Sequence, residues 1–137
     1  MENRRIVADT SVLIEFLRKR NRKKSLLWQL MERNHSIVIS TITVFELYAG
    51  AETEQHYEDL AKLLKWLEVV NLTEEVARTS GEIYKELKRK NTIIEFRDIF
   101  IGAMAIEFDL PLVTLHEKHF KKMEKLKLLK IKKRSNK

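Results

Sequence analysis

The segment RIVADTSVLIEFL, residues 5–17, decides the fold because its hydrophobic period changes within a few residues. Residues 5–8 form a short apolar run typical of a buried strand, and Asp9, Thr10 and Ser11 are residue types that cap helices. Apolar residues then recur at positions 12, 13, 16 and 17, which is the spacing of one helical face. The segment therefore predicts a strand, a tight turn and a helix.

The same alternation continues along the chain. Further strands are predicted at residues 37–39, 69–70 and 112–114, with a candidate edge strand at 128–131. Helical patterns lie between them, at about 26–31, 41–49, 57–67, 73–90 and 96–108, and a short one follows at 119–125. Short apolar strands separated by helices are typical of a parallel sheet covered on both faces. We predict an α/β fold, a three-layer α/β/α sandwich around a mainly parallel sheet of four to five strands.

Length and composition indicate one domain. The 137 residues are 44% hydrophobic and include no cysteine, which excludes disulfides and thiolate zinc sites. No apolar stretch approaches the ~20 residues of a membrane span, and no targeting segment is evident, so we expect a cytoplasmic protein. The predicted domain covers residues 1–131, followed by a basic, disordered tail at 132–137.

The net charge of +7 is unevenly distributed. Residues 121–137 carry nine Lys or Arg and one Glu, so the rest of the chain is close to neutral. Two local basic clusters remain, at residues 18–24 and 85–90. Each alone is typical of a solvated helix end, but several around an acidic site would attract a polyanion such as RNA.

Acidic side chains occur where the predicted strands end, which is where ligands bind in parallel sheets. Asp9 follows the first strand, Glu46 lies in the first turn of the helix after the second, Asp98 opens the apolar helix, and Glu117 follows the fourth strand. Each also has a structural interpretation. Asp9 fits a helix cap, Thr43 with Glu46 fits a capping box, and Asp98 fits a first-turn acid that stabilises the helix dipole.

The apolar surroundings of Asp9 and Asp98 favour a joint role. Both lie in apolar runs that should carry them inward, and a buried carboxylate normally needs a partner. The only adjacent cation is Arg97, which should point to another side of its helix. Carboxylates that converge without cations require a divalent ion, and an all-oxygen ligand set favours Mg²⁺ or Mn²⁺ over zinc.

Three blocks together resemble a known family. IVADTSVLIEF, TVFELYAGA and FRDIFIGAMAIEFDLPLVTLHEKHFKKM are similar, in order and separation, to the motifs of the VapC-type PilT N-terminus (PIN) domains. The resemblance implies an α/β/α sandwich whose acidic pocket binds Mg²⁺ or Mn²⁺ and cleaves RNA through a metal-activated water. It also implies a homodimer and a cognate antitoxin protein that inserts a peptide, often with an arginine, into the acidic groove.

The same resemblance assigns roles to individual residues. Asp9, Glu46 and Asp98 become metal ligands and catalytic residues, with Thr10 or Ser11 and Thr114 as polar neighbours. Glu95 matches a position that is often acidic in relatives. An ordinary acidic residue at the protein surface is an equally good interpretation of Glu95.

The last block departs from the family pattern. Relatives usually carry Asp or Asn two residues after the threonine, or an Asp just before the phenylalanine, and here these positions hold His116 and His119. Glu117, one residue away, is predicted to supply the fourth carboxylate through its longer side chain. His119 is interpreted as structural, and His116 stays open as an alternative ligand. The anomaly also leaves a second hypothesis, a catalytically inactive PIN-like module that binds RNA or protein.

Overall fold

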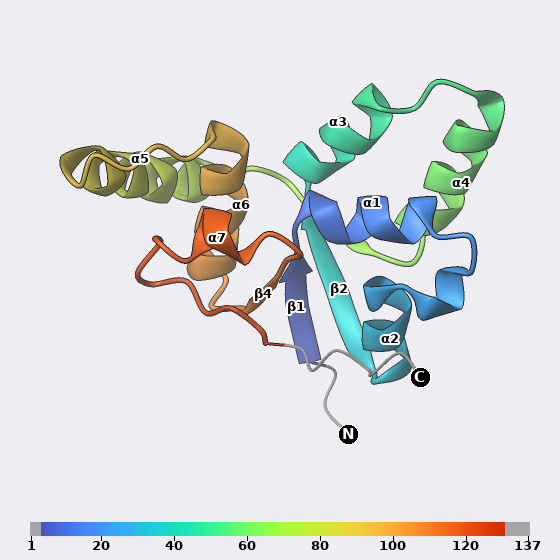
Figure 1. Cartoon of the computed structure of the whole chain (residues 1–137). Coiled ribbons are helices and arrows are strands. Elements are labelled where there is room, and N and C mark those ends of the chain that lie inside the picture. The colour runs from blue at the N-terminus through green and yellow to red at the C-terminus, as the bar shows by residue number, and fades with distance from the viewer. Residues whose placement is uncertain (1–3, 131–137) are drawn as a thin grey trace.

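The computed structural model describes residues 4–130 and contains a four-stranded parallel sheet with helices on both faces (Figure 1). The strands are β1 (Arg4–Ala8), β2 (His35–Ser40), β3 (Glu68–Val70) and β4 (Leu112–Val113), and their order in the sheet is β3-β2-β1-β4. All three pairings are parallel. The predicted sandwich is thereby confirmed.

Helical crossovers connect the strands. The connection from β1 to β2 contains α1 (Thr10–Arg18), the 3₁₀ helix η1 (Arg22–Lys24) and α2 (Leu26–Glu32). The next connection contains α3 (Thr41–Ala49) and α4 (Glu54–Leu64), and the third contains α5 (Glu74–Arg89) and α6 (Phe96–Glu107). The short helix α7 (Glu117–Phe120) follows β4.

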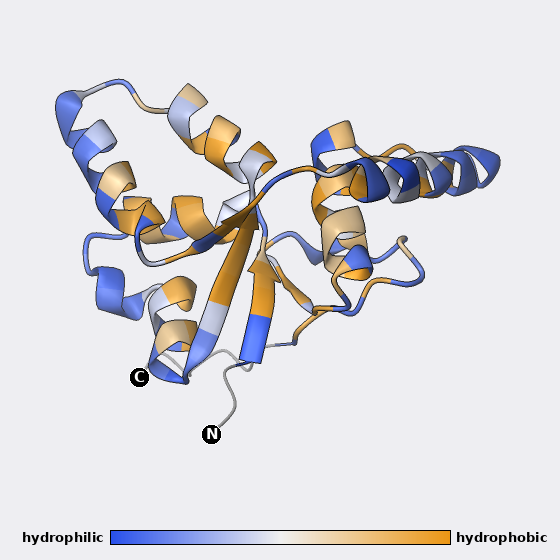
Figure 2. Cartoon of the chain, turned by 180° about the vertical axis from the view of Figure 1, so that it is seen from behind, coloured by the Kyte–Doolittle hydropathy of each residue, from blue (hydrophilic) through white to orange (hydrophobic). Residues whose placement is uncertain are grey.

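The two inner strands are buried on both faces, which explains their continuous apolar sequences. Ile6 and Ile37 contribute to one hydrophobic core with residues of α1, α2 and α4. Val7 and Val38, the next residues along each strand, contribute to a second core with residues of α5, α6 and α7. Figure 2 shows both strands as the apolar centre of the molecule, whereas α5 exposes a largely hydrophilic surface.

The C-terminal end differs in detail from the prediction. The candidate edge strand at 128–131 is reduced to a single parallel bridge between Leu128 and Leu112, and residue 131 lies outside the described residues. The helix predicted at 119–125 occupies Glu117–Phe120 instead. The predicted tail at 132–137 also lies outside the described residues. Within residues 4–130, no helix has the length and apolar character needed to cross a membrane.

A close contact fixes α6, the helix that carries Asp98. Gly102 lies one helical turn after Asp98, and a Cβ atom there would collide with the sulfur of the buried Met123. Gly102 therefore lets the segment after α7 approach the α6 backbone. Gly81, in α5, has open space around the position of a Cβ.

The two glycines predict opposite effects on stability. Gly81→Ala should raise the free energy of unfolding by about 0.5–1 kcal/mol, because alanine loses less backbone entropy in a helix. Gly102→Leu should lower it by roughly 1–3 kcal/mol through overpacking against Met123. Urea unfolding of both variants and the wild type measures the difference. A Gly102→Leu variant as stable as the wild type would show that this contact is not tight.

Candidate active site

Asp9 lies at the carboxyl end of β1, between the ends of β2 and β4. Its backbone N–H donates to the carbonyl of Val113 at 3.2 Å, and the residue is only 4% exposed. Ser11 Oγ donates to one carboxylate oxygen at 2.6 Å and Thr114 Oγ1 donates to the other at 2.9 Å. Asp9 occupies the N-cap position of α1 without a side-chain capping bond, so the interpretation as a capping side chain is wrong.

The pKa of Asp9 is raised above its ordinary value, mainly because burial penalises the charged form. The hydrogen bonds from Ser11 and Thr114 oppose this shift, and the nearby charge of Asp98 adds to it. Two neutral hydroxyl donors are thus the direct partners of a buried carboxylate that also faces a like charge. Such a group gains stability from a cation beside it.

Glu46 reaches the site from the second turn of α3 rather than from the predicted first turn, because the helix already begins at Thr41. The helix begins at Thr41 and is capped by Ser40, whose hydroxyl accepts from the backbone N–H of Ile42, so the predicted capping box of Thr43 and Glu46 is wrong. Instead, Thr10 Oγ1 donates to Glu46 Oε1 at 2.6 Å and lies 3.1 Å from Thr43 Oγ1. Glu46 is therefore held against the start of α1 by a side chain adjacent to Asp9.

Asp98 comes from the first turn of α6, as predicted, and its side chain is 19% exposed. Burial raises its pKa, and the charges of Glu95 and Glu46 act in the same direction. His119 opposes the shift, because its Nδ1 lies 3.0 Å from Asp98 Oδ2. His119 thus contacts a predicted ligand directly, which adds a site contact to the purely structural role expected for it.

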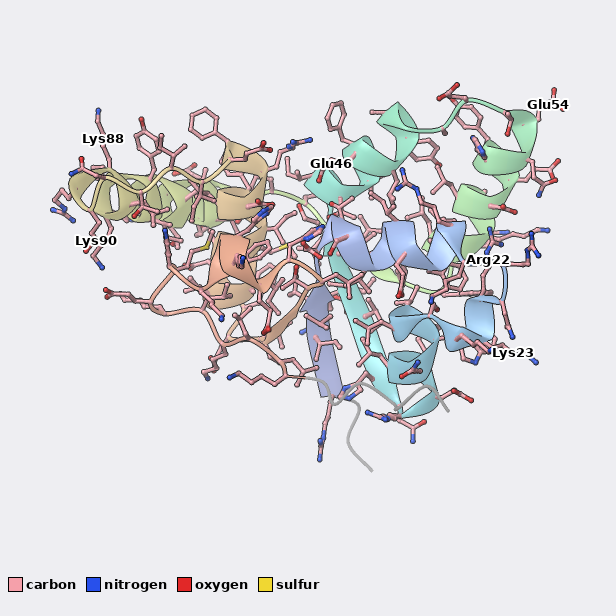
Figure 3. The ribbon with its side chains drawn as sticks, viewed as in Figure 1. Arg22, Lys23, Glu46, Glu54, Lys88 and Lys90 are labelled. Carbon is pink, nitrogen blue, oxygen red and sulfur yellow. The ribbon has the colours of Figure 1, made fainter. Side chains whose placement is uncertain are left out.

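Arg97 contradicts the expectation that these carboxylates converge without a cation. Its Nη1 lies 2.9 Å from Glu46 Oε2, and its Nη2 pairs with Glu95. The guanidinium lowers the pKa of Glu95. Arg97 points to a different side of its helix from Asp98, as predicted, but that side faces α3. Figure 3 shows Glu46 on the part of α3 that lies toward α6.

The loop after β4 is tied to Asp9 through its two hydroxyl partners. Thr114 Oγ1 accepts from the backbone N–H of His116 at 2.9 Å, and Ser11 Oγ accepts from that of Leu115 at 3.1 Å. The charge of His116 lowers the pKa of Asp9, and its ring stacks on that of His119 with centroids 5.3 Å apart. Glu117 opens α7, and within residues 4–130 no hydrogen bond or ion pair of its side chain ties it to the acidic site.

The predicted carboxylates are thus assembled from separate parts of the chain. Asp9, Glu46 and Asp98 come from β1, α3 and α6, and their charges act on one another as described above. Within residues 4–130, no three acidic or histidine side chains stand close enough to enclose a metal ion. Glu46 and Asp98 direct oxygens to Arg97 and His119 instead. The carboxylate oxygens suit a hard divalent cation. To bind it, Glu46 would exchange its contact with Arg97, and Asp98 its contact with His119, for the cation.

The predicted basic clusters lie at the outer flanks of the molecule. Figure 3 shows Lys88 and Lys90 near the end of α5 that lies away from the sheet, and Arg22 and Lys23 beyond the C-terminal end of α1 on the other side of the molecule. Glu46 lies between the two groups. Several of these cations are already paired, among them Arg22 with Asp59 at 3.0 Å. Their attraction for a polyanion is therefore weaker than their number indicates.

A groove of about 820 Å³ lies between α5 and the start of α6. Its lining includes the exposed aromatic residues Tyr84 and Phe96 together with Lys88, Glu95 and Arg97. Glu95 and Arg97 also form the rim of the acidic site. The groove itself contains none of Asp9, Glu46 and Asp98, so it adjoins the carboxylates rather than enclosing them.

Comparison with known proteins agrees with this arrangement. The chain is 32% identical over 128 residues to Ribonuclease VapC1 of Methanocaldococcus jannaschii, covering 93% of this chain and 87% of that protein. It is 32% identical over 123 residues to Ribonuclease VapC10 of Mycobacterium tuberculosis, covering 89% and 90%.

Solved structures show the same fold. The crystal structure of VapBC2 from Rickettsia felis, bound to a DNA fragment from their promoter, contains a chain that matches with a TM-score of 0.79 and 27% identity, over 91% of this chain and 97% of that one. DNA-bound VapBC from Salmonella typhimurium matches with a TM-score of 0.81 over 93% and 98%, at 24% identity.

The family model for the PIN domain matches residues 6–126, from within β1 to beyond β4, and includes the segments that supply Asp9, Glu46 and Asp98. With its fold, its relatives and these carboxylates in agreement, the chain belongs to the PIN-domain family.

Proposed function

We propose that this protein is a divalent-metal-dependent endoribonuclease and the toxin of a toxin–antitoxin pair. The observation that carries the proposal is the grouping of Asp9, Glu46 and Asp98 at the carboxyl edge of the sheet, where burial and like charge raise the pKa of both aspartates. The relatives named as ribonucleases span most of the chain and support the activity.

The proposed metal ligands are Asp9, Asp98 and Glu46, with Glu117 as the fourth carboxylate. When bound, Mg²⁺ or Mn²⁺ lowers the pKa of a coordinated water and neutralises charge on the phosphodiester. The chain itself would orient the ligands, because Ser11 and Thr114 fix both oxygens of Asp9 and Thr10 fixes one oxygen of Glu46. Glu46, which is less buried than Asp9, would ligate the ion or accept a proton from the attacking water.

The proposed substrate is RNA, and the proposed partner is a cognate antitoxin. The basic flanks would attract the phosphate backbone without sequence preference. The solved VapBC structure from Rickettsia felis supports an antitoxin partner. We also propose a homodimer and a cytoplasmic location.

A second candidate function is a catalytically inactive module that binds RNA or protein. The contacts of Arg97 with Glu46 and of His119 with Asp98 favour it, because both carboxylates have partners without a metal. Metal-stimulated RNA cleavage by the purified protein distinguishes the two candidates.

The first test of the site removes a ligand charge while keeping its volume. Asp98→Asn and Asp9→Asn should each reduce Mg²⁺-supported RNA cleavage by roughly 100-fold or more, since even changes outside the ligand set cost about 10–100-fold. Asp109→Asn is the matched control, because this exposed residue follows α6 and, within residues 4–130, forms its ion pair with Lys127. EDTA should abolish wild-type cleavage. Near wild-type rates in either site variant would contradict the ligand assignment.

The second test measures stability in the absence of metal. The folded-state pKa of Asp98 is raised, so its ionisation opposes folding above the ordinary value of 3.8, and this penalty fades as the pH falls through that region. Metal-free Asp98→Asn should therefore melt above the metal-free wild type at pH 7, with a smaller difference near pH 4. Mg²⁺ should raise the melting temperature of the wild type more than that of the variant.

A lower melting temperature for metal-free Asp98→Asn, with equal responses to Mg²⁺, would instead identify Asp98 as a structural residue of α6. Asp109→Asn again serves as the control for the substitution itself.

The third test addresses the fourth ligand. If Glu117 fills this position, Glu117→Gln should lower Mg²⁺-supported activity at least ~10-fold, while His116→Ala leaves it largely unchanged. If His116 fills it, the effects should be reversed and activity should prefer Mn²⁺, because imidazole suits Mn²⁺ better than Mg²⁺. Cleavage rates of both variants with each metal give the answer. If neither substitution changes activity, the metal has three protein carboxylates as ligands and water completes its coordination shell.

A further inference from the structure

We propose that Arg97 is a phosphate-binding residue of this site, held by Glu46 in the metal-free protein and released to the RNA when Glu46 turns to the metal. The inference rests on the proposed function and adds a residue to it. It begins from the contacts of Glu46, both of whose oxygens are engaged. Thr10 donates to Oε1, and the Arg97 guanidinium donates to Oε2.

Metal binding would affect the two partners of Glu46 differently. If Glu46 directs Oε2 to a divalent ion, Thr10 can keep its bond to Oε1, whereas Arg97 loses the more buried of its two carboxylate partners. Glu95 remains beside Arg97, but the side chain of Glu95 is 66% exposed and that of Glu46 only 16%. A solvated ion pair of this kind is weak. Metal binding would therefore free a guanidinium at the rim of the site.

The position of Arg97 suits a phosphate. Its side chain is 52% exposed and lies between the carboxylates and the groove lined by Tyr84 and Phe96. An RNA strand that entered from the groove would meet the guanidinium before it reached Asp98, the next residue along the chain. The planar fork of an arginine donates two parallel hydrogen bonds to a phosphate, and a lysine cannot reproduce this geometry.

Arg97 would also have an acidic partner in both states. Without metal, Arg97 and His119 are the basic side chains paired with the acidic set of Glu46, Glu95 and Asp98 in residues 4–130. With metal and RNA, the ion would take the carboxylates and the phosphate would take Arg97. As an additional charge opposite the phosphodiester, Arg97 would stabilise the extra negative charge that develops during cleavage.

The test compares Arg97→Ala and Arg97→Lys with Arg89→Ala, an exposed arginine of α5 that pairs with Glu86 away from the site. Without RNA, titration calorimetry with Mn²⁺ should give Arg97→Ala an affinity equal to or several-fold above that of the wild type, because Glu46 has lost a competitor. A structural role for Arg97 in positioning Glu46 would weaken Mn²⁺ binding instead.

The RNA arm uses fluorescence anisotropy with a short single-stranded RNA, in EDTA and in Ca²⁺. Arg97→Ala should weaken binding roughly 10-fold in Ca²⁺ and much less in EDTA, where Glu46 already occupies the guanidinium. Equal losses in both conditions, or none in Ca²⁺, would overturn the proposal. Arg89→Ala should show no dependence on Ca²⁺. These binding measurements require no cleavage, so they test the role of Arg97 independently of activity. Failure of the wild type to cleave RNA would overturn the proposed function, not the role of Arg97 in binding.

The kinetic arm measures single-turnover cleavage over a series of Mn²⁺ concentrations that reaches saturation. Arg97→Ala should be at least ~10-fold slower and Arg97→Lys intermediate. Added guanidinium ions should partly restore Arg97→Ala, and the neutral analogue urea should not. Full activity of Arg97→Ala, or recovery simply by raising the Mn²⁺ concentration, would overturn the proposal.

Discussion

The burial of Asp9 at the carboxyl end of the central strand is the constraint on which the rest of the site depends. β1 has neighbours on both sides and helices on both faces, so the first residue beyond it is enclosed. Two hydroxyl groups satisfy the oxygens of Asp9 but carry no charge. Burial raises the pKa of Asp9, so keeping its charge requires compensation, which a nearby cation supplies best. The nearby charge of Asp98 makes that requirement stronger.

The backbone arrangement of this site could be predicted from the sequence. Strands at 5–8 and 112–114 and the apolar helix that begins near Asp98 are all visible in the hydrophobic period, and a parallel sheet brings strand ends to one edge. The placement of Asp9 and Asp98 follows from these elements alone. Local pattern and topology are sufficient here because both residues lie within a few positions of the end of an element.

Side-chain partners between distant helices could not be predicted in the same way. Consecutive residues of a helix point about 100° apart, so Arg97 and Asp98 face different neighbours, and only the packing of α6 beside α3 shows that Arg97 meets Glu46. The error over the capping box has a similar origin. Ser40, Thr41 and Thr43 are all capping residue types, and the end of β2 decides that Ser40 is the cap.

The pairing of the carboxylates with Arg97 and His119 also explains how such a site folds before it binds a ligand. Without partners, Glu46 and Asp98 would add their repulsion to the cost of burying Asp9. With these partners, part of the repulsion is offset inside the chain, and the contacts stay exchangeable because Arg97 and His119 are each about half exposed. Asp9 has no such basic partner among the described hydrogen bonds and ion pairs. The unsatisfied charge is therefore concentrated at the deepest carboxylate, where a bound cation would gain the most.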